Sequence, residues 1–525
     1  MRPETIAANT QIPAATRQAG VCLHVTSLPG RYGIGEIGSQ ALAFVDTIKR
    51  MQLGVWQFLP LGPTAYGDSP YQPLSTFAGN EMLIDIADLI QQGLLFDYEV
   101  RPLTALAAGI VDYGRLIPTK TALLRLAAER FEAKADSALK AELDQFIDDN
   151  DDSWLRDYAL FRILKSAHGE RPWPEWEPEY AHYEGAALRR LEKERAAEIA
   201  EIKTIQYLFH RQWQHLREYA NESGVRLFGD MPIYIALDSA DAWANREILR
   251  INDDGKPERV AGVPPDYFSI DGQLWGNPLY DWQMHAGTGY RWWIDRMRAS
   301  LRTADMIRID HFIGFEIFWS VPADAASARD GVWESGPGDA IFDAMQRELG
   351  HLPIVAENLG VITPAVEALR HRHQIPGMVV LQFSIRHSDF SLDQVPENCV
   401  CYTGTHDNDT TLGWFRGSPD DMRSAEEMQA TRQAALELTG GSAETISMDL
   451  VRTAFSTKAR LAIAPMQDYL GLGSEARLNT PGTSSNNWRW RILSTQLTGE
   501  LCDNIASTVI SSGRELHNDR FKAQG

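Results

Sequence analysis

Four carboxylates in this sequence follow short apolar runs. They are Asp230, Asp310, Glu357 and Asp407, with Arg308 and His311 beside Asp310 and His406 beside Asp407. A single acid in such a position more often caps the helix that follows. Four such acids, two of them next to basic side chains, favour one shared catalytic pocket.

Clustered carboxylates with aromatic residues suit the chemistry of glycosidic bonds. One carboxyl group donates a proton to the leaving oxygen, and a second acts as nucleophile or positions water. Aromatic rings can stack on sugar faces, and the chain has 15 Trp, 16 Tyr and 19 Phe. In the competing chemistry acids bind Mg²⁺ to stabilise an enolate, which needs a Lys or His base and suits anionic substrates. No lysine stands at these strand ends, so the residues favour sugar chemistry.

Eight apolar runs without polar alternation predict buried parallel strands. They cover residues 21–25, 55–59, 225–228, 306–309, 353–356, 378–383, 399–402 and 461–464. Helical patterns separate many of them, and the clearest is 39–51, with Ser39 as its expected N-cap. The alternation predicts a (β/α)8 TIM barrel, in which all strand C-termini, and therefore the four acids, meet on one face. An open doubly wound sheet is the structural alternative.

The whole chain, residues 1–525, is predicted to be a single catalytic barrel with insertions. Residues 85–222 are rich in helix formers and predict an inserted, largely helical subdomain. Residues 245–290 concentrate glycine, proline and aromatic residues without periodicity. We interpret this segment as an inserted loop region over the active site, because long irregular loops in compact domains are usually functional.

Charge and hydropathy exclude several classes of function. The net charge is 50 − 71 = −21, which disfavours nucleic acid and anionic membrane surfaces as partners. No run approaches the roughly 18 apolar residues of a membrane span, and residues 1–20 lack the apolar core of a signal peptide. The four cysteines are too few and scattered for a disulfide framework. We expect a cytoplasmic protein.

One cofactor motif occurs, but its context is wrong. The segment GIGEIG at 33–38 matches the dinucleotide-binding fingerprint, yet seven residues separate it from the preceding predicted strand, and the next strand ends without an acid for the ribose. The pair His371 and His373 could mimic metal ligands, but it stands at the end of a helical pattern, where cations are favourable. We expect neither a cofactor nor a metal.

At its strand ends the chain resembles the 4-α-glucanotransferases, also called amylomaltases or disproportionating enzymes, of glycoside hydrolase family 77. The resemblance extends from residue 20 to about residue 491. It rests on the segments TSLP at 26–29, YGDSPYQ at 66–72, GDMPIY at 229–234, GVPPDYF at 262–268, RIDH at 308–311, AENLG at 356–360 and GTHDN at 404–408.

The resemblance implies a retaining transfer of α-1,4-glucan segments between maltooligosaccharides. It implies that Asp310 is the nucleophile, Glu357 the general acid/base and Asp407 the stabiliser of the transition state. The substrate-binding residues it implies are Ser69, Tyr71, Asp230, Tyr267, Phe268, Gln273, Trp275, Arg308, His311 and His406.

Two alternatives remain open at this point. The same residues could act mainly as an α-1,4-glucan hydrolase, because water and a sugar hydroxyl compete for one intermediate. A non-catalytic glucan-binding protein is the other alternative, although all three expected catalytic carboxylates are present. The sequence does not indicate the oligomeric state.

Overall fold

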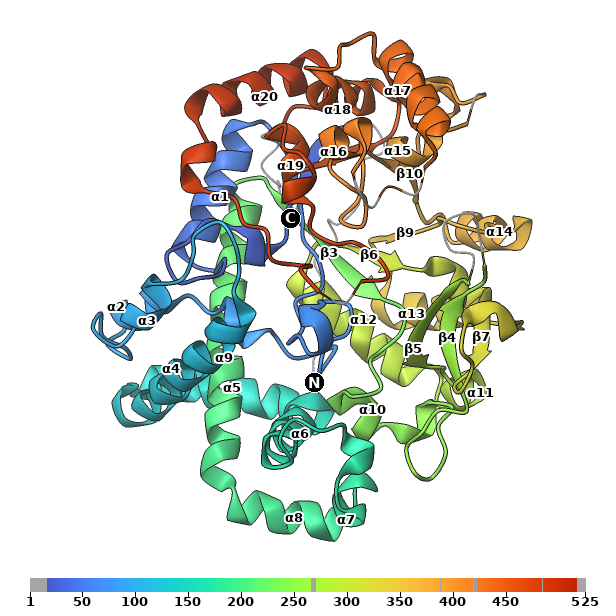
Figure 1. The fold of residues 1–525 in the computed structure, drawn as a ribbon. Helices are drawn as coiled ribbons and strands as arrows, with labels where there is room; N and C mark the ends of the chain where they lie inside the picture. The colour runs from blue at the N-terminus through green and yellow to red at the C-terminus, as the bar shows by residue number, and fades with distance from the viewer. Residues whose placement is uncertain are drawn as a thin grey trace, which may run out of the picture.

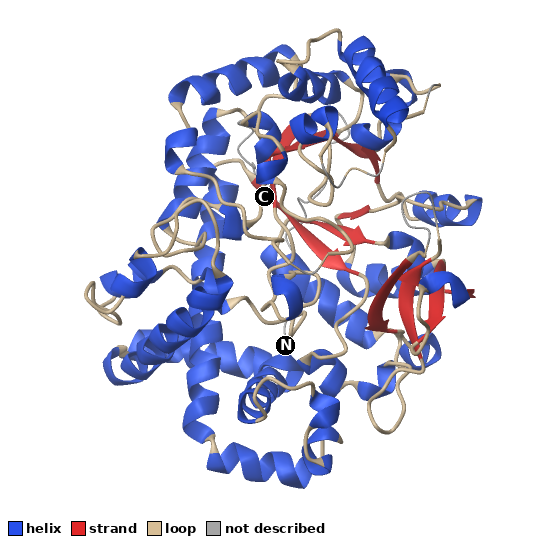
Figure 2. Cartoon of the chain, viewed as in Figure 1, coloured by secondary structure: helices blue, strands red, loops and turns tan. Residues whose placement is uncertain are grey.

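The computed structural model describes residues 17–265, 271–387, 389–418, 421, 423–483 and 485–516. Its centre is an eight-stranded parallel sheet, with helices around it (Figures 1 and 2). The strands follow one another in the order β10-β11-β12-β1-β2-β3-β6-β9. They are β1 (Gln18–Cys22), β2 (Val55–Gln57), β3 (Arg226–Pro232), β6 (Met306–Asp310), β9 (Ile354–Ala356), β10 (Gly377–Val380), β11 (Cys399–Tyr402) and β12 (Leu461–Pro465).

The two end strands of this sheet also meet, which closes it into a barrel. The backbone N–H of Ala356, in β9, donates to the carbonyl of Pro376, directly before β10, at 2.8 Å. The predicted TIM barrel is therefore confirmed, and each of the eight predicted runs overlaps one strand.

Two local predictions differ from the structure. The run 378–383 divides into strand β10 and helix α15 (Leu381–Ser384). Helix α1 (Ser39–Arg50) has Gly38, not Ser39, as its N-cap, and the Ser39 N–H donates to Asp85 Oδ2 at 3.4 Å. A side chain at residue 38 would collide with Asp85, because its Cβ would lie 1.8 Å from Oδ2. An acid distant in the sequence thus takes the place of the expected local cap.

Most helices lie between successive barrel strands. Residues 85–222 contain α2 (Ile86–Gln91), α3 (Arg101–Thr104), α4 (Tyr113–Lys134), α5 (Ser137–Asn150), α6 (Arg156–Ala167), α7 (Pro178–Ala181), α8 (Gly185–Glu194) and α9 (Ala196–Glu222). The later helices are α10 (Ala240–Ala244), α11 (Trp282–Gly287), α12 (Arg291–Thr303), α13 (Asp339–Leu349), α14 (Pro364–Arg372), α16 (Thr411–Arg416), α17 (Ala425–Thr439), α18 (Ile446–Ser456), α19 (Met466–Tyr469) and α20 (Gly499–Ser511). No helix among the described residues is long and apolar enough to cross a membrane.

A second, antiparallel sheet lies beside the barrel (Figure 2). Its order is β5-β4-β7-β8, from β4 (Arg259–Val263), β5 (Gln273–Pro278), β7 (Ile317–Pro322) and β8 (Val332–Ser335). Residues 245–290 are predicted from the sequence as a loop region, whereas the structure contains β4, β5 and α11 there. The reason is that β4 pairs with β7, which begins more than 50 residues further along the chain.

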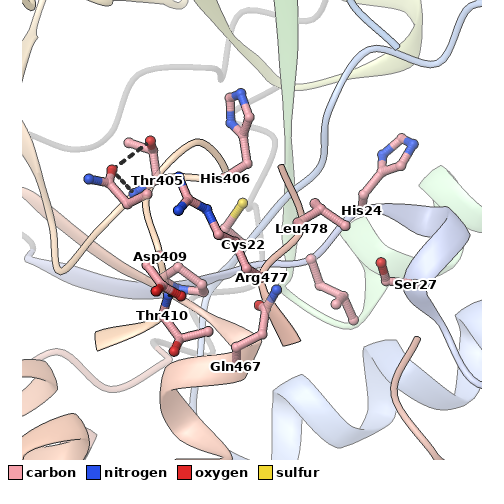
Figure 3. Close-up of a pocket in the computed structure, with 13 residues that line it drawn as sticks. Cys22, His24, Ser27, Thr405, His406, Asp409, Thr410, Gln467, Arg477 and Leu478 are labelled. Atoms are coloured by element: carbon pink, nitrogen blue, oxygen red, sulfur yellow. Dashed lines mark hydrogen bonds between the residues drawn. The ribbon is translucent and has the colours of Figure 1, made fainter. Parts of the chain in front are cut away.

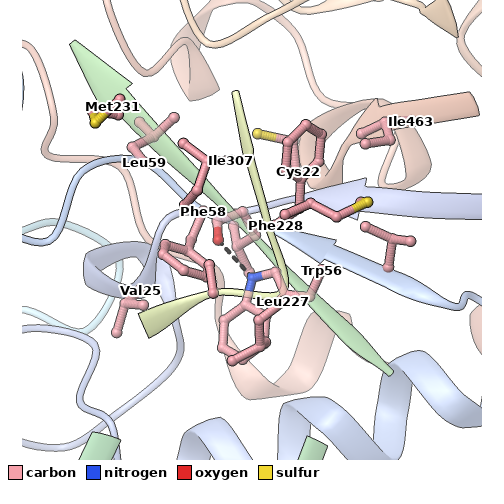
Figure 4. Close-up of a cluster of buried hydrophobic side chains, with 14 of the residues drawn as sticks. Cys22, Val25, Trp56, Phe58, Leu59, Leu227, Phe228, Met231, Ile307 and Ile463 are labelled. Carbon is pink, nitrogen blue, oxygen red and sulfur yellow. Dashed lines mark hydrogen bonds between the residues drawn. The ribbon is translucent and has the colours of Figure 1, made fainter. Parts of the chain in front are cut away.

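Large side chains fill the barrel and the space between its strands and helices (Figure 4). Trp56 on β2 is fully buried, and its Nε1 donates to the Leu23 carbonyl at 2.8 Å. Phe58 and Phe228 connect the ends of β2 and β3 through a backbone hydrogen bond of 2.9 Å. This packing holds the strand ends in fixed relative positions.

A buried ion pair connects helix α4 to the segment between β1 and α1. Lys120 on α4 contacts Glu36, in the segment between β1 and α1, and their side chains are 0% and 6% exposed. We expect Lys120→Met to lower the free energy of unfolding by about 3 kcal/mol, because it leaves Glu36 buried without its cation. Urea denaturation measures this change. The double variant Glu36→Met/Lys120→Met should recover much of the loss, and an unchanged midpoint in Lys120→Met would contradict a stabilising role for the pair.

Candidate active site

Three of the four carboxylates lie on or directly after the neighbouring strands β3, β6 and β9, and Asp407 lies in the turn that follows β11. In the sheet register Asp230 on β3 pairs with Arg308 on β6, and Pro232 pairs with Asp310. Glu357 directly follows β9, whose Ala356 pairs with Ile309 of β6. The structure thus brings Asp230, Asp310 and Glu357 to one face, as expected for the C-terminal ends of parallel strands.

Arg308 connects the carboxylates of Asp230 and Asp310. Its Nε and Nη2 lie 2.9 and 2.8 Å from Asp230 Oδ2, and Nη2 also donates to Asp310 Oδ1 at 2.9 Å. Burial alone would lower the pKa of Arg308, but Asp230, Tyr71 and Asp310 together raise this pKa well above its usual value. The guanidinium is therefore a permanent charge that compensates two carboxylates and fixes their orientation.

Two backbone amides hold the carboxyl group of Glu357. The N–H of His311 donates to Oε2 and the N–H of Leu359 to Oε1, both at 2.8 Å. Burial, and next the charge of Asp310, raise the pKa of Glu357 to about 7, although Arg308 and the two amides oppose this rise. Glu357 can therefore give or take a proton near neutral pH.

His311 connects Asp310 to Glu357 through an unusual backbone conformation. Its φ is 53°, in the left-handed region that few non-glycine residues adopt, and its N–H bonds Glu357. Burial lowers the pKa of its imidazole to about 4, despite the opposing charge of Asp310. The ring is thus neutral at physiological pH.

Asp407 is held as a carboxylate, in contrast to Glu357, whose pKa is raised. Burial would raise its pKa, but the charge of His406 and hydrogen bonds from His406 and Asn479 hold it well below the usual value. Asn479 Nδ2 donates to Asp407 Oδ1 at 2.6 Å, and His406 Nε2 lies 3.3 Å from Oδ2. Asp407 is therefore a carboxylate wherever Glu357 can still carry a proton.

Hydrogen bonds within the turn that carries Asp407, and one from Gln382 outside it, hold its backbone in place. Asn408 Oδ1 accepts hydrogen bonds from the N–H and the hydroxyl of Thr405, both at 2.9 Å (Figure 3). Gln382 Nε2 donates to the Asp409 carbonyl at 3.0 Å. A small pocket lies against this turn, and His24, His406 and Arg477 are among the residues that line it.

Aromatic side chains surround the carboxylates. Tyr71 and His406 stack with ring centroids 5.0 Å apart, and Trp488 lies 5.9 Å from Tyr71. The Tyr71 hydroxyl donates to Asp230 Oδ2 at 2.8 Å. On the other side, Trp275 packs edge-on against His311 at 4.7 Å. These rings form walls on which a sugar could stack.

Of the remaining predicted substrate-binding residues, two hydrogen-bond to aromatic neighbours and two lie outside the described part of the chain. Ser69 Oγ accepts from the Tyr71 N–H at 3.2 Å, and Gln273 Oε1 accepts from Trp275 Nε1 at 3.1 Å, so both support an aromatic neighbour. Tyr267 and Phe268 lie outside the described residues. Within the described ranges, no group of three or more His, Cys, Asp or Glu side chains could hold a metal ion.

Sequence reasoning missed residues of the segment that follows β12. Asn479 binds the side chain of Asp407, Arg477 Nη2 donates to its carbonyl at 2.9 Å, and Trp488 borders Tyr71. This segment has no regular periodicity and no acid beside a strand. Only its contacts in the fold connect it to the site.

Comparisons with known proteins show the family to which this chain is similar. A family model described as 4-alpha-glucanotransferase, of glycoside hydrolase family 77, matches residues 23–496. Proteins named 4-alpha-glucanotransferase from Thermus thermophilus and Streptococcus pneumoniae are 44% and 43% identical, each over 92% of this chain and over 96% and 94% of their own. An amylomaltase from Streptococcus agalactiae, solved with acarbose, superposes with a TM-score of 0.89 at 34% identity, over 95% of this chain and 100% of that one.

The raised pKa of Glu357 can be tested directly. We expect its carboxyl group to titrate near pH 7, and Asp310→Asn to lower this pKa, because the substitution removes a neighbouring negative charge. Infrared difference titration of the carboxyl band, with Glu357→Gln as the reference that identifies the signal, measures both. Titration near the ordinary 4.5 in the unaltered protein would contradict the effect of burial.

Proposed function

The chain belongs to the 4-alpha-glucanotransferase family and is an enzyme of that class, and we propose that Asp310, Glu357 and Asp407 carry out its reaction by a retaining double displacement. The donor is a maltooligosaccharide or another α-1,4-glucan, and the acceptor is the 4-hydroxyl of a second sugar. The observation that carries this assignment is that Glu357 accepts a hydrogen bond from the amide directly after Asp310. An acid that titrates near neutrality therefore lies beside a carboxylate.

In the first step Glu357 is the acid and Asp310 the nucleophile. Glu357 gives its proton to the glycosidic oxygen as the bond from that oxygen to the anomeric carbon breaks. An oxygen of Asp310 bonds to this carbon, so the shortened donor leaves with a free 4-hydroxyl and the rest of the chain stays as an ester. Arg308 orients Asp310 for the attack.

In the second step Glu357 acts as a base. Now a carboxylate, it takes the proton from the 4-hydroxyl of the acceptor, whose oxygen bonds to the anomeric carbon while the Asp310 ester breaks. Both residues return to their starting protonation states. Because each step inverts the anomeric carbon, the α configuration is retained.

The remaining site residues stabilise and bind. Asp407, held as a carboxylate, stabilises the positive charge of the oxocarbenium-like transition state. Tyr71 stacks beneath the donor sugar, His311 and His406 bond its hydroxyls, and Asp230 supports the site through Arg308. Trp275 and Gln273, together with Ser69, Tyr267 and Phe268, complete the set that we assign to substrate.

Transfer is favoured over the two alternatives. Relatives at 42–44% identity that span over 90% of this chain are named for glucan transfer, not hydrolysis. The same names argue against a non-catalytic binding protein. As part of this proposal we place the enzyme in the cytoplasm, where free thiols persist, because its four cysteines are free and buried.

Product analysis tests the activity and the nucleophile together. The protein incubated with maltotriose alone should yield glucose and a ladder of chains longer than the input. The Asp310→Asn variant should be at least about a thousandfold slower, since its amide is a poor nucleophile. Chromatography by chain length measures the products over time. Only maltose and glucose would identify a hydrolase, and an Asp310→Asn variant with normal activity would reject the nucleophile.

Within this set we assign Trp275 to the binding of the acceptor sugar, and Trp275→Ala tests this role. Loss of one stacking ring should raise the KM for an acceptor such as maltose roughly two- to tenfold and increase the share of hydrolysis, because acceptor then competes less well with water. Trp333→Ala, at a ring 41% exposed on β8, is the matched control. Equal transfer-to-hydrolysis ratios in the two variants would argue against the role.

A further inference from the structure

The barrel closes next to Glu357, and its closing seam is sparsely bonded. On one side Glu357 is held by β6 and the residues after it: its N–H donates to the Ile309 carbonyl at 3.0 Å, and its carbonyl accepts from Phe312 at 3.1 Å. On the other side, facing β10, the Ala356 N–H reaches Pro376 at 2.8 Å. The next bond across this seam comes from a side chain, that of Asn358.

The side-chain amide of Asn358 accepts one hydrogen bond and donates another. Its Oδ1 accepts from the Met378 N–H of β10 at 2.7 Å, and its Nδ2 donates to Glu367 Oε1, on α14, at 3.0 Å. Glu367 is itself oriented by Arg370, whose Nη2 lies 2.5 Å from Oε2. A carboxylate at residue 358 could accept from Met378 but could not donate to Glu367.

The Asn358 amide fits against β10 because residue 377 is a glycine and has no side chain. A Cβ on Gly377, the first residue of β10, would lie 2.9 Å from both terminal atoms of Asn358. The backbone of β10 therefore approaches the amide closely, and any larger residue would displace it.

We propose that Asn358 is a positioning residue for Glu357: its amide joins β9 to β10 and α14, and so fixes the main chain 357–359 that aims the Glu357 carboxyl group. The inference rests on the assignment of Glu357 as acid/base made above. The Leu359 N–H, which bonds Glu357 Oε1, belongs to the residue that follows Asn358. Movement of residue 358 therefore changes both the direction of the carboxyl group and one of its donors.

The direction of the effect on pH dependence follows from the groups that face Glu357. Asp310 raises its pKa, while Arg308 and the amides of Leu359 and His311 lower it; the imidazole of His311 is neutral near pH 7, and Glu367 lies beyond Asn358. If residues 357–359 shift, the donor that stabilises the carboxylate weakens. The pKa of Glu357 then rises, and the alkaline limb of kcat/KM moves to higher pH.

The first test is Asn358→Ala, assayed on maltotriose across pH. We expect kcat roughly tenfold lower, because the acid is misaligned, with KM little changed and the alkaline limb displaced upward. Gly377→Ala, which displaces the amide without replacing it, should shift the limb in the same direction. Glu367→Gln is the matched control, because its Oε1 can still accept from Asn358. A merely structural loss would reduce the folded fraction and leave the limb in place.

The second test exchanges the donor and acceptor. Asn358→Asp, nearly isosteric, faces the carboxylate of Glu367 and should lose activity as the alanine variant does. Asn358→Asp/Glu367→Gln restores one donor and one acceptor, and kcat should return to within about threefold of Glu367→Gln. Glu357→Gln distinguishes failure of the positioning role from failure of the acid/base assignment. If it is inactive while both Asn358 variants keep the normal rate and pH profile, the positioning role is wrong and the acid/base assignment stands; if Glu357→Gln is fully active, that assignment fails.

Discussion

The site depends on the buried guanidinium of Arg308. Two carboxylates, Asp230 and Asp310, lie within 2.9 Å of it, and its charge compensates that of Asp230, whose side chain is fully buried in the barrel. The Tyr71 hydroxyl lies 3.3 Å from the same cation and donates to Asp230, so the stacking wall is fixed by the same contact. One residue on β6 thus sets the orientation of Asp310, the proposed nucleophile, and of the Tyr71 ring beside it.

The remaining acids differ in protonation because their surroundings differ, not because of their residue types. Burial and the charge of Asp310 raise the pKa of Glu357 to about 7, against the opposing effects of Arg308 and two backbone amides. Asp407 is kept ionised by an imidazole and the Asn479 amide. This difference is what a reaction with one acid and one permanent carboxylate requires. The side chains that produce this difference come from three parts of the chain: Asp310 ends β6, His406 follows β11, and Asn479 follows β12.

The placement of Glu357 beside the closing seam has a structural consequence. Parallel strands supply few contacts where β9 meets β10, and the side chain of Asn358 adds a bond that the backbone does not make. Under our proposal, the position of Glu357 as the acid and the closure of the barrel rely on the same side chain, that of Asn358. The small antiparallel sheet contributes differently, by bringing Trp275 against His311 from outside the barrel.

The sequence by itself determined the eight barrel strands and the acids at their ends, because buried parallel strands are continuous apolar runs and their C-termini share one face. It did not determine the pairing of β4 with β7, the capping of α1 by Asp85, or the contacts of Asn479, Arg477 and Trp488 with the site. Each of these joins residues distant in the chain and leaves no local pattern. The protonation states of Glu357 and Asp407 were also decided only by tertiary structure, since burial and neighbouring charge exist only after folding.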